Sequence, residues 1–180
     1  MNLRDPMKPE LLEILPASIE DHPIIQNMAR FYLYDMSKFC HQGSKDWTIP
    51  EDGLYVCNDF KSYFETADRK AFLVKIKQEL AGFVLLNKKG TCKNTDWNMG
   101  EFFILGRFQK QGFATQTAYQ IWKSHPGRWE VAVIPENIPA LNFWRKSINH
   151  FTQGNYQEVI KQIDYDEHQP KRYIFTFEVK

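Results

Sequence analysis

The fold of this chain is best predicted from Gln109-Lys110-Gln111-Gly112-Phe113-Ala114, with Thr115 directly behind it. This stretch follows the apolar run 102–105 and leads into a helical pattern that reaches Trp122. A strand, a short loop and a helix in this order turn several backbone N–H groups toward one point, where an anion can bind. Gly112 can take a positive φ and leaves room for a ligand to approach the backbone. The pattern therefore predicts a phosphate-binding loop, or else an ordinary tight turn between a strand and a helix.

Two widespread phosphate-binding motifs are missing from the sequence. No G-x-G-x-x-G follows a strand, so the dinucleotide-binding pattern is excluded. No Gly-Lys-Ser or Gly-Lys-Thr occurs either, which excludes the nucleotide-triphosphate loop.

Apolar periodicity divides the rest of the chain into strands and helices. A long loop is expected at 42–58, and a hairpin turn at Gln78-Glu79. Gly82, inside a predicted strand, indicates close approach of another backbone. Strands are predicted at 11–15, 71–76, 80–87, 97–105, 129–134, 158–163 and 172–179, and helices at 22–39, 59–66, from Gly112 to about Ser124, and 139–149. Two strand–helix units in the middle, with antiparallel strands around them, predict a mixed sheet covered by helices.

Composition narrows the class of protein. The 180 residues, 43% hydrophobic and 25% charged, suit a single domain over residues 1–180. The net charge of +1, without a long basic run, argues against nucleic acid as a partner. No apolar stretch approaches the ~20 residues that span a bilayer. Because Met1–Glu10 is polar and lacks a signal core, we expect a cytoplasmic protein that does not bind membranes.

Cysteine and histidine spacing predicts neither disulfides nor a metal site. Cys40, Cys57 and Cys92 are odd in number and form no C-x-x-C, so we expect reduced thiols. The five histidines lack H-E-x-x-H or another close ligand spacing, so no metal is expected.

Two motifs resemble those of the GNAT N-acyltransferases. The spacing Q-x-x-G-x-A at 109–114 is similar to their pyrophosphate-binding signature Q/R-x-x-G-x-G/A, at which they bind acetyl-CoA. Asn137-Ile138-Pro139-Ala140-Leu141-Asn142-Phe143-Trp144 is similar to their N-x-x-A-x-x-F-Y segment, and 101–114 to a core written E-h-h-V-x-P-x-Y-x-x-x-G-x-G. The resemblance covers roughly residues 10–180 and extends to a poorly characterised bacterial branch of predicted acetyltransferases. It implies an α+β fold with α-β-α layers, in which a mixed, mostly antiparallel sheet carries helices on both faces.

The same resemblance implies where acetyl-CoA binds. Amides of the 109–114 loop would hold the pyrophosphate, and the backbone of 104–106 the pantetheine arm, with an amide near Ile104 polarising the thioester carbonyl. Asn137 would bond the arm, although a plain N-cap explains it too. Phe143 and Trp144 would line the channel, although a core stripe explains them as well. The implied contact residues are Ile104, Leu105, Gly106, Gln109, Lys110, Gln111, Gly112, Phe113, Ala114, Thr115, Asn137, Phe143 and Trp144.

Three positions depart from the family pattern. Lys110 stands where a glycine is common, and Gly106 where proline or a polar residue is usual. Trp144 stands where many relatives have a tyrosine that donates a proton to the departing thiolate. An indole N–H is too weakly acidic for that role.

Glu101 is the predicted general base, acting directly or through water. A carboxylate in a buried strand should have a raised pKa, which suits base chemistry near neutral pH. Alternatively, Glu101 pairs with a core Arg or Lys, or faces solvent.

The acceptor site is expected on the first helix and the loop after it. Tyr34 and Asp35 are the predicted substrate-binding residues, because an acidic and aromatic pocket suits a cationic amine. Tyr32, Trp47 and Tyr55 are further candidates, and Tyr32 and Tyr34 also fit a helix surface or core position.

The predicted function is transfer of an acetyl group from acetyl-CoA to a primary amine by direct attack, with a small-molecule or peptide amine as acceptor. Two alternatives stay open. A degenerate domain would bind acyl-CoA or a partner protein without transfer, as the loss of tyrosine at Trp144 suggests. An interaction protein would form a homodimer through its sheet edge and splayed strands.

Overall fold

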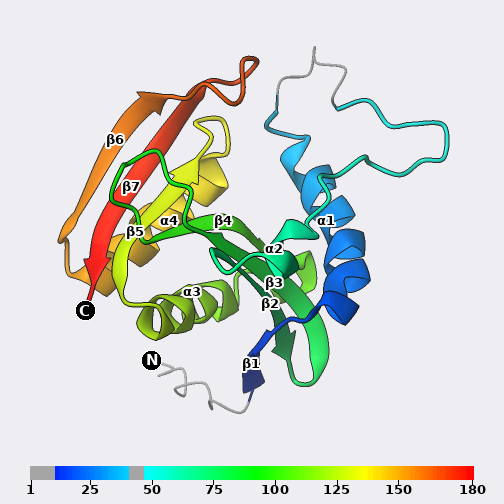
Figure 1. The fold of residues 1–180 in the computed structure, drawn as a ribbon, viewed down its shortest axis with the longest axis horizontal. Coiled ribbons are helices and arrows are strands. Elements are labelled where there is room, and N and C mark those ends of the chain that lie inside the picture. Colours follow the sequence, from blue (N-terminus) through cyan, green and yellow to red (C-terminus); the bar gives the residue numbers. More distant parts are fainter. Residues whose placement is uncertain (1–10, 41–46) are drawn as a thin grey trace, which may run out of the picture.

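The protein is described by a computed structural model that covers residues 11–40 and 47–180 (Figure 1). Expectations for Met1–Glu10 and for the first part of the 42–58 loop lie outside the described residues. The strands are β1 (Leu12–Pro16), β2 (Arg69–Ile76), β3 (Glu79–Asn87), β4 (Trp97–Ile104), β5 (Gly127–Val133), β6 (Tyr156–Gln162) and β7 (Lys171–Val179). The helices are α1 (His22–Met36), α2 (Ser62–Glu65), α3 (Phe113–Ser124) and α4 (Ile138–Thr152), with 3-10 turns η2 (Ile19–Asp21) and η4 (Gly106–Phe108).

The seven strands form one sheet in the order β1-β2-β3-β4-β5-β7-β6. Neighbours are antiparallel except β4 and β5, which are parallel and pair only at Trp97↔Trp129 and Asn98↔Glu130. Beyond these two pairs the strands separate. The mixed, mostly antiparallel sheet implied by the family resemblance is therefore confirmed.

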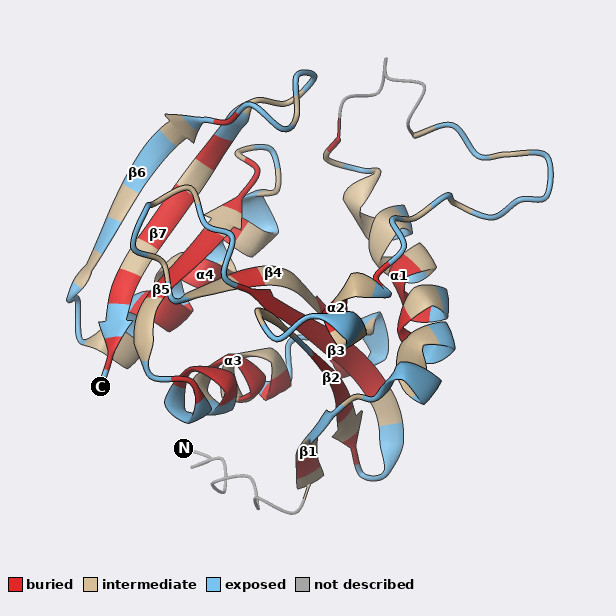
Figure 2. Cartoon of the chain, viewed as in Figure 1, coloured by how far each residue is buried: buried red, intermediate tan, exposed pale blue. Residues whose placement is uncertain are grey.

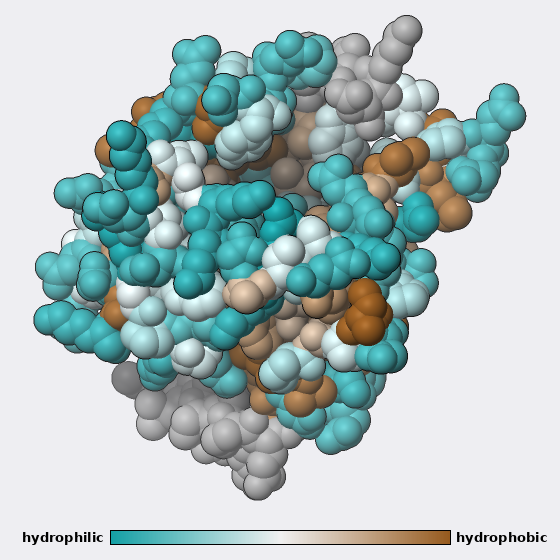
Figure 3. All heavy atoms as spheres, in the orientation of Figure 1, coloured by the Kyte–Doolittle hydropathy of each residue, from teal (hydrophilic) through white to brown (hydrophobic). Residues whose placement is uncertain are grey.

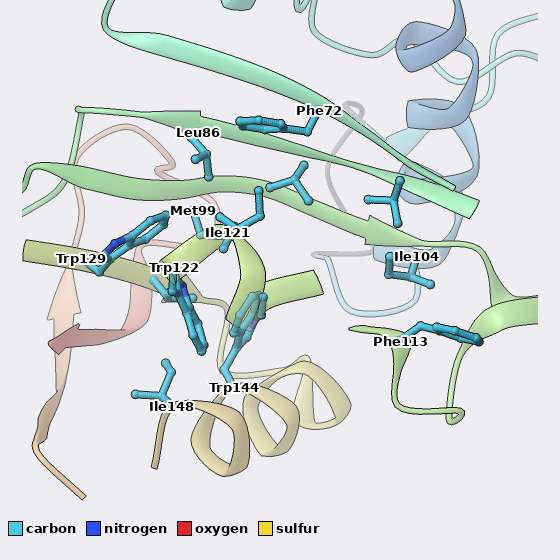
Figure 4. Packing of buried hydrophobic residues seen from close by; sticks show 14 of the residues in the cluster. Phe72, Leu86, Met99, Ile104, Phe113, Ile121, Trp122, Trp129, Trp144 and Ile148 are labelled. Atoms are coloured by element: carbon cyan, nitrogen blue, oxygen red, sulfur yellow. The ribbon is translucent and has the colours of Figure 1, made fainter. Parts of the chain in front are cut away.

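Helices cover the two faces of the sheet unequally. On one face, Trp122 of α3 and Trp144 and Ile148 of α4 pack against the strands, with Trp129 of β5 close to Trp122 (Figure 4). On the other face, α1 and α2 cover β2 to β4, as seen for Ile25 against the Phe83 region. Because both faces are covered there, β3 is a nearly continuous buried run (Figure 2). Among the described residues, the strands β5 to β7 have no helix over this second face, which leaves room for a site (Figure 1).

Most element boundaries follow the apolar pattern, and the differences have local causes. The hairpin turn is Lys77-Gln78, with φ of 51° and 68°, and Glu79 already belongs to β3. Two left-handed residues match the twist of the adjoining strands, and this geometry outweighs the preference for glycine. Gly82 fulfils its prediction, since a Cβ there would lie 2.1 Å from the carbonyl oxygen of Phe103.

Candidate active site

The separation of β4 from β5 begins at a β-bulge. The β3–β4 register shifts between Leu85 and Leu86, and Gly100 is the extra residue on β4. A Cβ on Gly100 would lie 2.6 Å from the Tyr63 hydroxyl oxygen and 2.7 Å from Asn87 Nδ2, so only glycine fits this packing. The bulge bends β4 and adds twist, which carries its second half away from β5.

Two cavities meet at this opening. The splay cavity, about 300 Å³, lies between the strands and is lined by Tyr32, Glu101, Phe102, Val131, Asn137 and Trp144, among others. The polar chamber, about 890 Å³, lies beside α2 and extends toward β5 and β6, with Tyr63, Asn87, Asn98, Glu101, Glu130 and Lys161 in its wall. Asn98 and Glu101 belong to both walls. Figure 3 shows the molecular surface recessed between the α1 side and the β5–β7 side.

Glu101 lies where the two cavities join. Burial raises the pKa of its carboxyl group to about 7, and the nearby Tyr32 hydroxyl, within hydrogen-bonding reach, partly offsets that rise. Burial and the Glu101 carboxylate raise the pKa of Tyr32 well above its ordinary value. Within the described residues Glu101 forms no ion pair with a lysine or arginine. A carboxyl group with a pKa raised in this way can both accept and release a proton near neutral pH, as a general base requires.

The 109–114 loop contains two left-handed residues, a feature that anion-binding loops share. Gly112 has a φ of 88° and stands directly before α3, while Lys110 has a φ of 59°. Alternation of left-handed and right-handed residues turns successive N–H groups to one side. The first helical N–H with a partner one turn back is that of Gln116, bonded to the carbonyl of Gly112 at 3.1 Å. The N–H groups of Phe113, Ala114 and Thr115 precede it and, by helix geometry, lack such a partner.

Side chains brace this loop from behind. Gln109 Nε2 donates to the carbonyl of Ile104 at 2.7 Å, and Gln111 Nε2 donates to the carbonyl of Arg107 at the same distance. Lys110 holds the left-handed conformation without being glycine, which costs about 1–2 kcal/mol. Lys110, which stands where the family often has a glycine, thus adopts a conformation that glycine takes easily.

The backbone of 104–106 is only partly available for a ligand. The Leu105 N–H donates to the carbonyl of Ala81 at 2.8 Å, and the Leu105 carbonyl accepts from the N–H of Phe108. The Leu105 N–H is therefore not open to a pantetheine arm, and a role for Leu105 in binding that arm stays a prediction. In a strand successive N–H groups point to opposite edges. The Ile104 N–H therefore points away from β3, toward the opening between β4 and β5. No atom lies within 4 Å of a Cβ built on Gly106, which leaves that position open.

Asn137 and the aromatic pair have structural roles as well as a place at the splay cavity. Asn137 Oδ1 accepts from the N–H of Ala140 at 3.1 Å, so it caps α4, and its Nδ2 lies 3.6 Å from Met36 Sδ. Trp144 is 6% exposed, and its ring lies 5.0 Å from that of Phe102, on which Phe143 stacks. Asn137 and Trp144 also line the splay cavity. Their positions are therefore compatible both with a helix cap and a core residue and with contacts to a cofactor.

The predicted acceptor residues are not brought to either cavity. Tyr34 is 58% exposed, and Asp35 pairs with Lys38 at 2.8 Å on the surface of α1. Trp47 and Tyr55 do not line the cavities either. Tyr34 and Asp35 do not line either cavity, because the inward face of α1 carries residues three and four apart, ending with Tyr32 and Met36. Their role in binding the acceptor stays a prediction.

Sequence reasoning missed the polar side chains of the chamber. Their signal was a carboxylate or an amide inside apolar strands, as with Glu130 between Trp129 and Val131. Glu130 is 1% exposed and accepts from the N–H groups of Thr91 at 2.7 Å and Cys92 at 3.0 Å. It therefore anchors the loop between β3 and β4, which forms one wall of the chamber.

Comparison with known proteins agrees with this geometry. Residues 31–149 match the model of the acetyltransferase (GNAT) family. Among solved structures, an acetyltransferase from Thermus thermophilus is 16% identical, with 93% of this chain and 97% of that one covered and a TM-score of 0.63. A Salmonella typhimurium acetyl transferase that modifies the N-terminal serine of a 50S ribosomal subunit protein is 13% identical, with 94% and 96% covered and a TM-score of 0.62. A dodecameric spermidine N-acetyltransferase from Vibrio cholerae is 13% identical, with 94% of both chains covered and a TM-score of 0.59. By sequence, no curated protein matches this chain.

The chain belongs to the GNAT family of acetyltransferases, and its solved structural neighbours share the fold at low identity. In residues 11–40 and 47–180, no helix is long and apolar enough to cross a membrane. Across the same ranges, no three His, Cys, Asp or Glu side chains gather as ligands for a metal ion. The three cysteines are free thiols.

Proposed function

We propose that this protein transfers an acetyl group from acetyl-CoA to a primary amine by direct attack of the amine. The observation that carries the proposal is the position of Glu101. Its carboxyl group, with a pKa raised to about 7, lies at the opening between β4 and β5. The same strand leads, through one 3-10 turn, into the anion-binding loop at 109–114. A base and a phosphate site on either side of one opening suit a two-substrate transfer.

The residues that would hold acetyl-CoA fit its chemistry. The N–H groups before and within the first turn of α3, in the loop shaped by Lys110 and Gly112, suit a pyrophosphate. At the opening between β4 and β5, the Ile104 N–H and the Asn137 amide would bind the polar groups of the pantetheine arm, and Trp144 would contact the apolar part of that arm. Bound there, acetyl-CoA supplies an acyl group activated as a thioester. The Ile104 N–H would donate to the carbonyl oxygen, where negative charge develops during attack.

Glu101 would take a proton from the acceptor ammonium, so that the nitrogen lone pair becomes free to attack. The acceptor would enter from the polar chamber, since Glu101 lines its wall. A proton donor for the departing sulfur is not mandatory, because thiols ionise near pH ~8.5 and leave readily as thiolates. Trp144 in place of tyrosine is therefore compatible with catalysis.

The acceptor proposed here is a small-molecule or peptide amine. Two structural neighbours support an amine acceptor, because one is named a spermidine N-acetyltransferase and the other is described as modifying an N-terminal serine. A homodimer is a further proposal. The edge strand β6 exposes Val159 and Ile160, and a second copy of the chain would cover them (Figure 2).

A degenerate domain that binds acyl-CoA without transfer is the second candidate, favoured by the burial of Trp144 in the core. Calorimetric titration with acetyl-CoA, followed by a thiol-release assay over a broad amine panel, separates the two. Binding with turnover of an amine supports the transferase. Binding without turnover supports the module, and absence of binding contradicts both.

A further inference from the structure

One polar atom at the junction of the two cavities has no partner. Asn98 Oδ1 is closed off from solvent and makes no hydrogen bond within the described residues. The other end of the same amide, Nδ2, donates to Asn87 Oδ1 at 3.2 Å. A buried acceptor without a donor is unfavourable for folding alone, so it calls for an explanation in terms of a ligand or water.

The neighbouring network decides which end of the Asn98 amide faces Asn87. Asn87 Oδ1 also accepts from the N–H of Lys89 at 2.8 Å, and Asn87 Nδ2 donates to the Tyr63 hydroxyl at 2.9 Å. Asn87 Oδ1 therefore faces Asn98 as an acceptor, and Asn98 donates to it through its NH₂ group. Its own oxygen is left as the unpaired atom. Gly100 makes the network possible, since a Cβ there would meet both Tyr63 and Asn87.

Asn98 and Glu101 are successive side chains on one face of β4. Side chains alternate along a strand, and the bulge at Gly100 adds one residue between them. Both line the splay cavity and the polar chamber, so a group entering between the cavities reaches both. Asn98 Oδ1 is closed off from solvent in this structure, so it meets a donor in the chamber by rotation of the amide, which gives up the single 3.2 Å bond to Asn87 Oδ1.

We propose that Asn98 binds the acceptor amine together with Glu101, and that this pair of acceptors selects primary over secondary amines. The inference rests on the proposed transferase function and adds a substrate-binding residue to it.

The stoichiometry of N–H groups gives the reason for this selectivity. Once an ammonium has given one proton to Glu101, a primary amine keeps two N–H groups and one lone pair. One N–H donates to the Glu101 side and the other to Asn98 Oδ1, which fixes the direction of the lone pair toward the thioester. A secondary amine has a single N–H after deprotonation and leaves one of the two acceptors unpaired. Sites built to bond an N–H discriminate strongly against analogues that lack it.

The test compares one primary amine that the protein acetylates with its N-methyl derivative. We expect the wild type to prefer the primary amine by about 100-fold in kcat/KM. Asn98→Leu, similar in size but without an acceptor, should lower kcat/KM for the primary amine by about 30-fold and leave the N-methyl amine nearly unchanged. The matched control is Asn94→Leu, an exposed residue of the β3–β4 loop outside both cavities, which should change neither value. Acetyl-CoA affinity, measured by calorimetry, should be the same in all three proteins.

Asn98→Asp keeps an acceptor oxygen but loses the NH₂ group that donates to Asn87 Oδ1, so thermal unfolding is measured for both variants before their kinetics are compared. Asn98→Asp should retain the preference for the primary amine, and its pH profile should move to higher pH because a second carboxylate raises the pKa of Glu101. If Asn98→Leu lowered kcat/KM equally for both amines, or left the wild-type preference for the primary amine unchanged, the proposed role of Asn98 would be overturned and the transferase function would stand. Binding of acetyl-CoA without turnover of any amine would overturn the transferase function and this inference with it.

Discussion

The two sides of the proposed active site are built in different ways. Most of the donor side is one contiguous segment, from Ile104 to Thr115, whose chemistry lies in backbone N–H groups and φ angles, and only Asn137 and Trp144 are added to it from elsewhere. The acceptor side draws single side chains from α2, β3, β4, β5 and β6, which the fold brings together around the polar chamber. A contiguous segment can be recognised in a sequence by spacing alone. A chamber assembled from distant side chains is recognised only once the sheet order is known.

This difference also separates the effects of substitutions. A change on the donor side should alter acetyl-CoA binding and leave the choice of amine intact. A change on the acceptor side should alter turnover or amine selectivity and leave acetyl-CoA binding intact. Glu101 lines both cavities and is the residue at which the two sides meet.

Removing the proposed base should have the largest effect. Glu101→Gln keeps the size of the side chain and should reduce kcat by about 10²–10⁴-fold, the usual contribution of a general base. Calorimetry should give the same affinity for acetyl-CoA as the wild type. The ratio of wild-type to variant kcat/KM should fall about tenfold per pH unit below the Glu101 pKa of about 7. Since ionisation of the amine is common to both proteins, a pH-independent ratio would contradict the assignment.

The same pKa shift has a consequence for stability. The folded protein binds the Glu101 proton more tightly than the unfolded chain, whose ordinary glutamate value is 4.5. The stabilisation from this proton is complete below pH 4.5 and is lost as the pH rises through about 7. Thermal unfolding should therefore show the wild type losing stability relative to Glu101→Gln across this interval.

Gly112→Glu should have the next largest effect, confined to the donor side. A side chain at a φ of 88° is strained, and its carboxylate would repel a pyrophosphate. We expect acetyl-CoA affinity to fall by about 100-fold or more, measured by calorimetry. Gly53→Glu is the matched control, since Gly53 also has a positive φ, of 74°, and open space around it. Equal loss of affinity in both variants would point to general strain and not to the loop.

Tyr32→Phe should have a smaller effect on the acceptor side. The Tyr32 hydroxyl lowers the pKa of Glu101, so its removal should raise that pKa further. The acidic limb of the pH–kcat/KM profile should move to higher pH, by up to about one unit, with little change at the alkaline plateau. An unchanged limb would show that the hydroxyl does not bond Glu101 in solution.

Tyr34→Ala and Asp35→Ala should have the smallest effects. Both residues lie on the outer surface of α1, away from the two cavities. Surface substitutions of this kind change stability by about 0.5 kcal/mol or less, and we expect KM for the amine to change by less than about twofold. A tenfold rise in KM for the amine would show that Tyr34 or Asp35 contributes to acceptor binding, and would contradict the acceptor site described above.

Much of the fold could be predicted because its signals are local. The strand before Gln109, the left-handed Gly112 and the helix after it follow from spacing and glycine chemistry. Glu101 was identified from the resemblance and from a carboxylate in an apolar strand. The sequence was less informative where tertiary structure decides. Leu105 was assigned to a ligand, yet its N–H belongs to the ladder with β3. Tyr34 and Asp35 were chosen for their chemistry, whereas the helix face decides which residues look inward. Asn98 carried only the weak signal of an amide inside a strand, and its role became visible once Asn87 and Tyr63 were seen beside it.

The two residue pairs between β4 and β5 have a mechanical meaning. Every other neighbouring pair of strands is joined by a longer ladder, so the backbone hydrogen bonds that link β1–β4 to β5–β7 are few. The sheet thus has two halves joined by a short ladder, and the contact of Trp97 with Trp129 and the core under α3 and α4 pack across that junction. Relative rotation of the two halves would break fewer backbone bonds at this junction than between any other neighbouring strands. The proposed site for both substrates opens next to it.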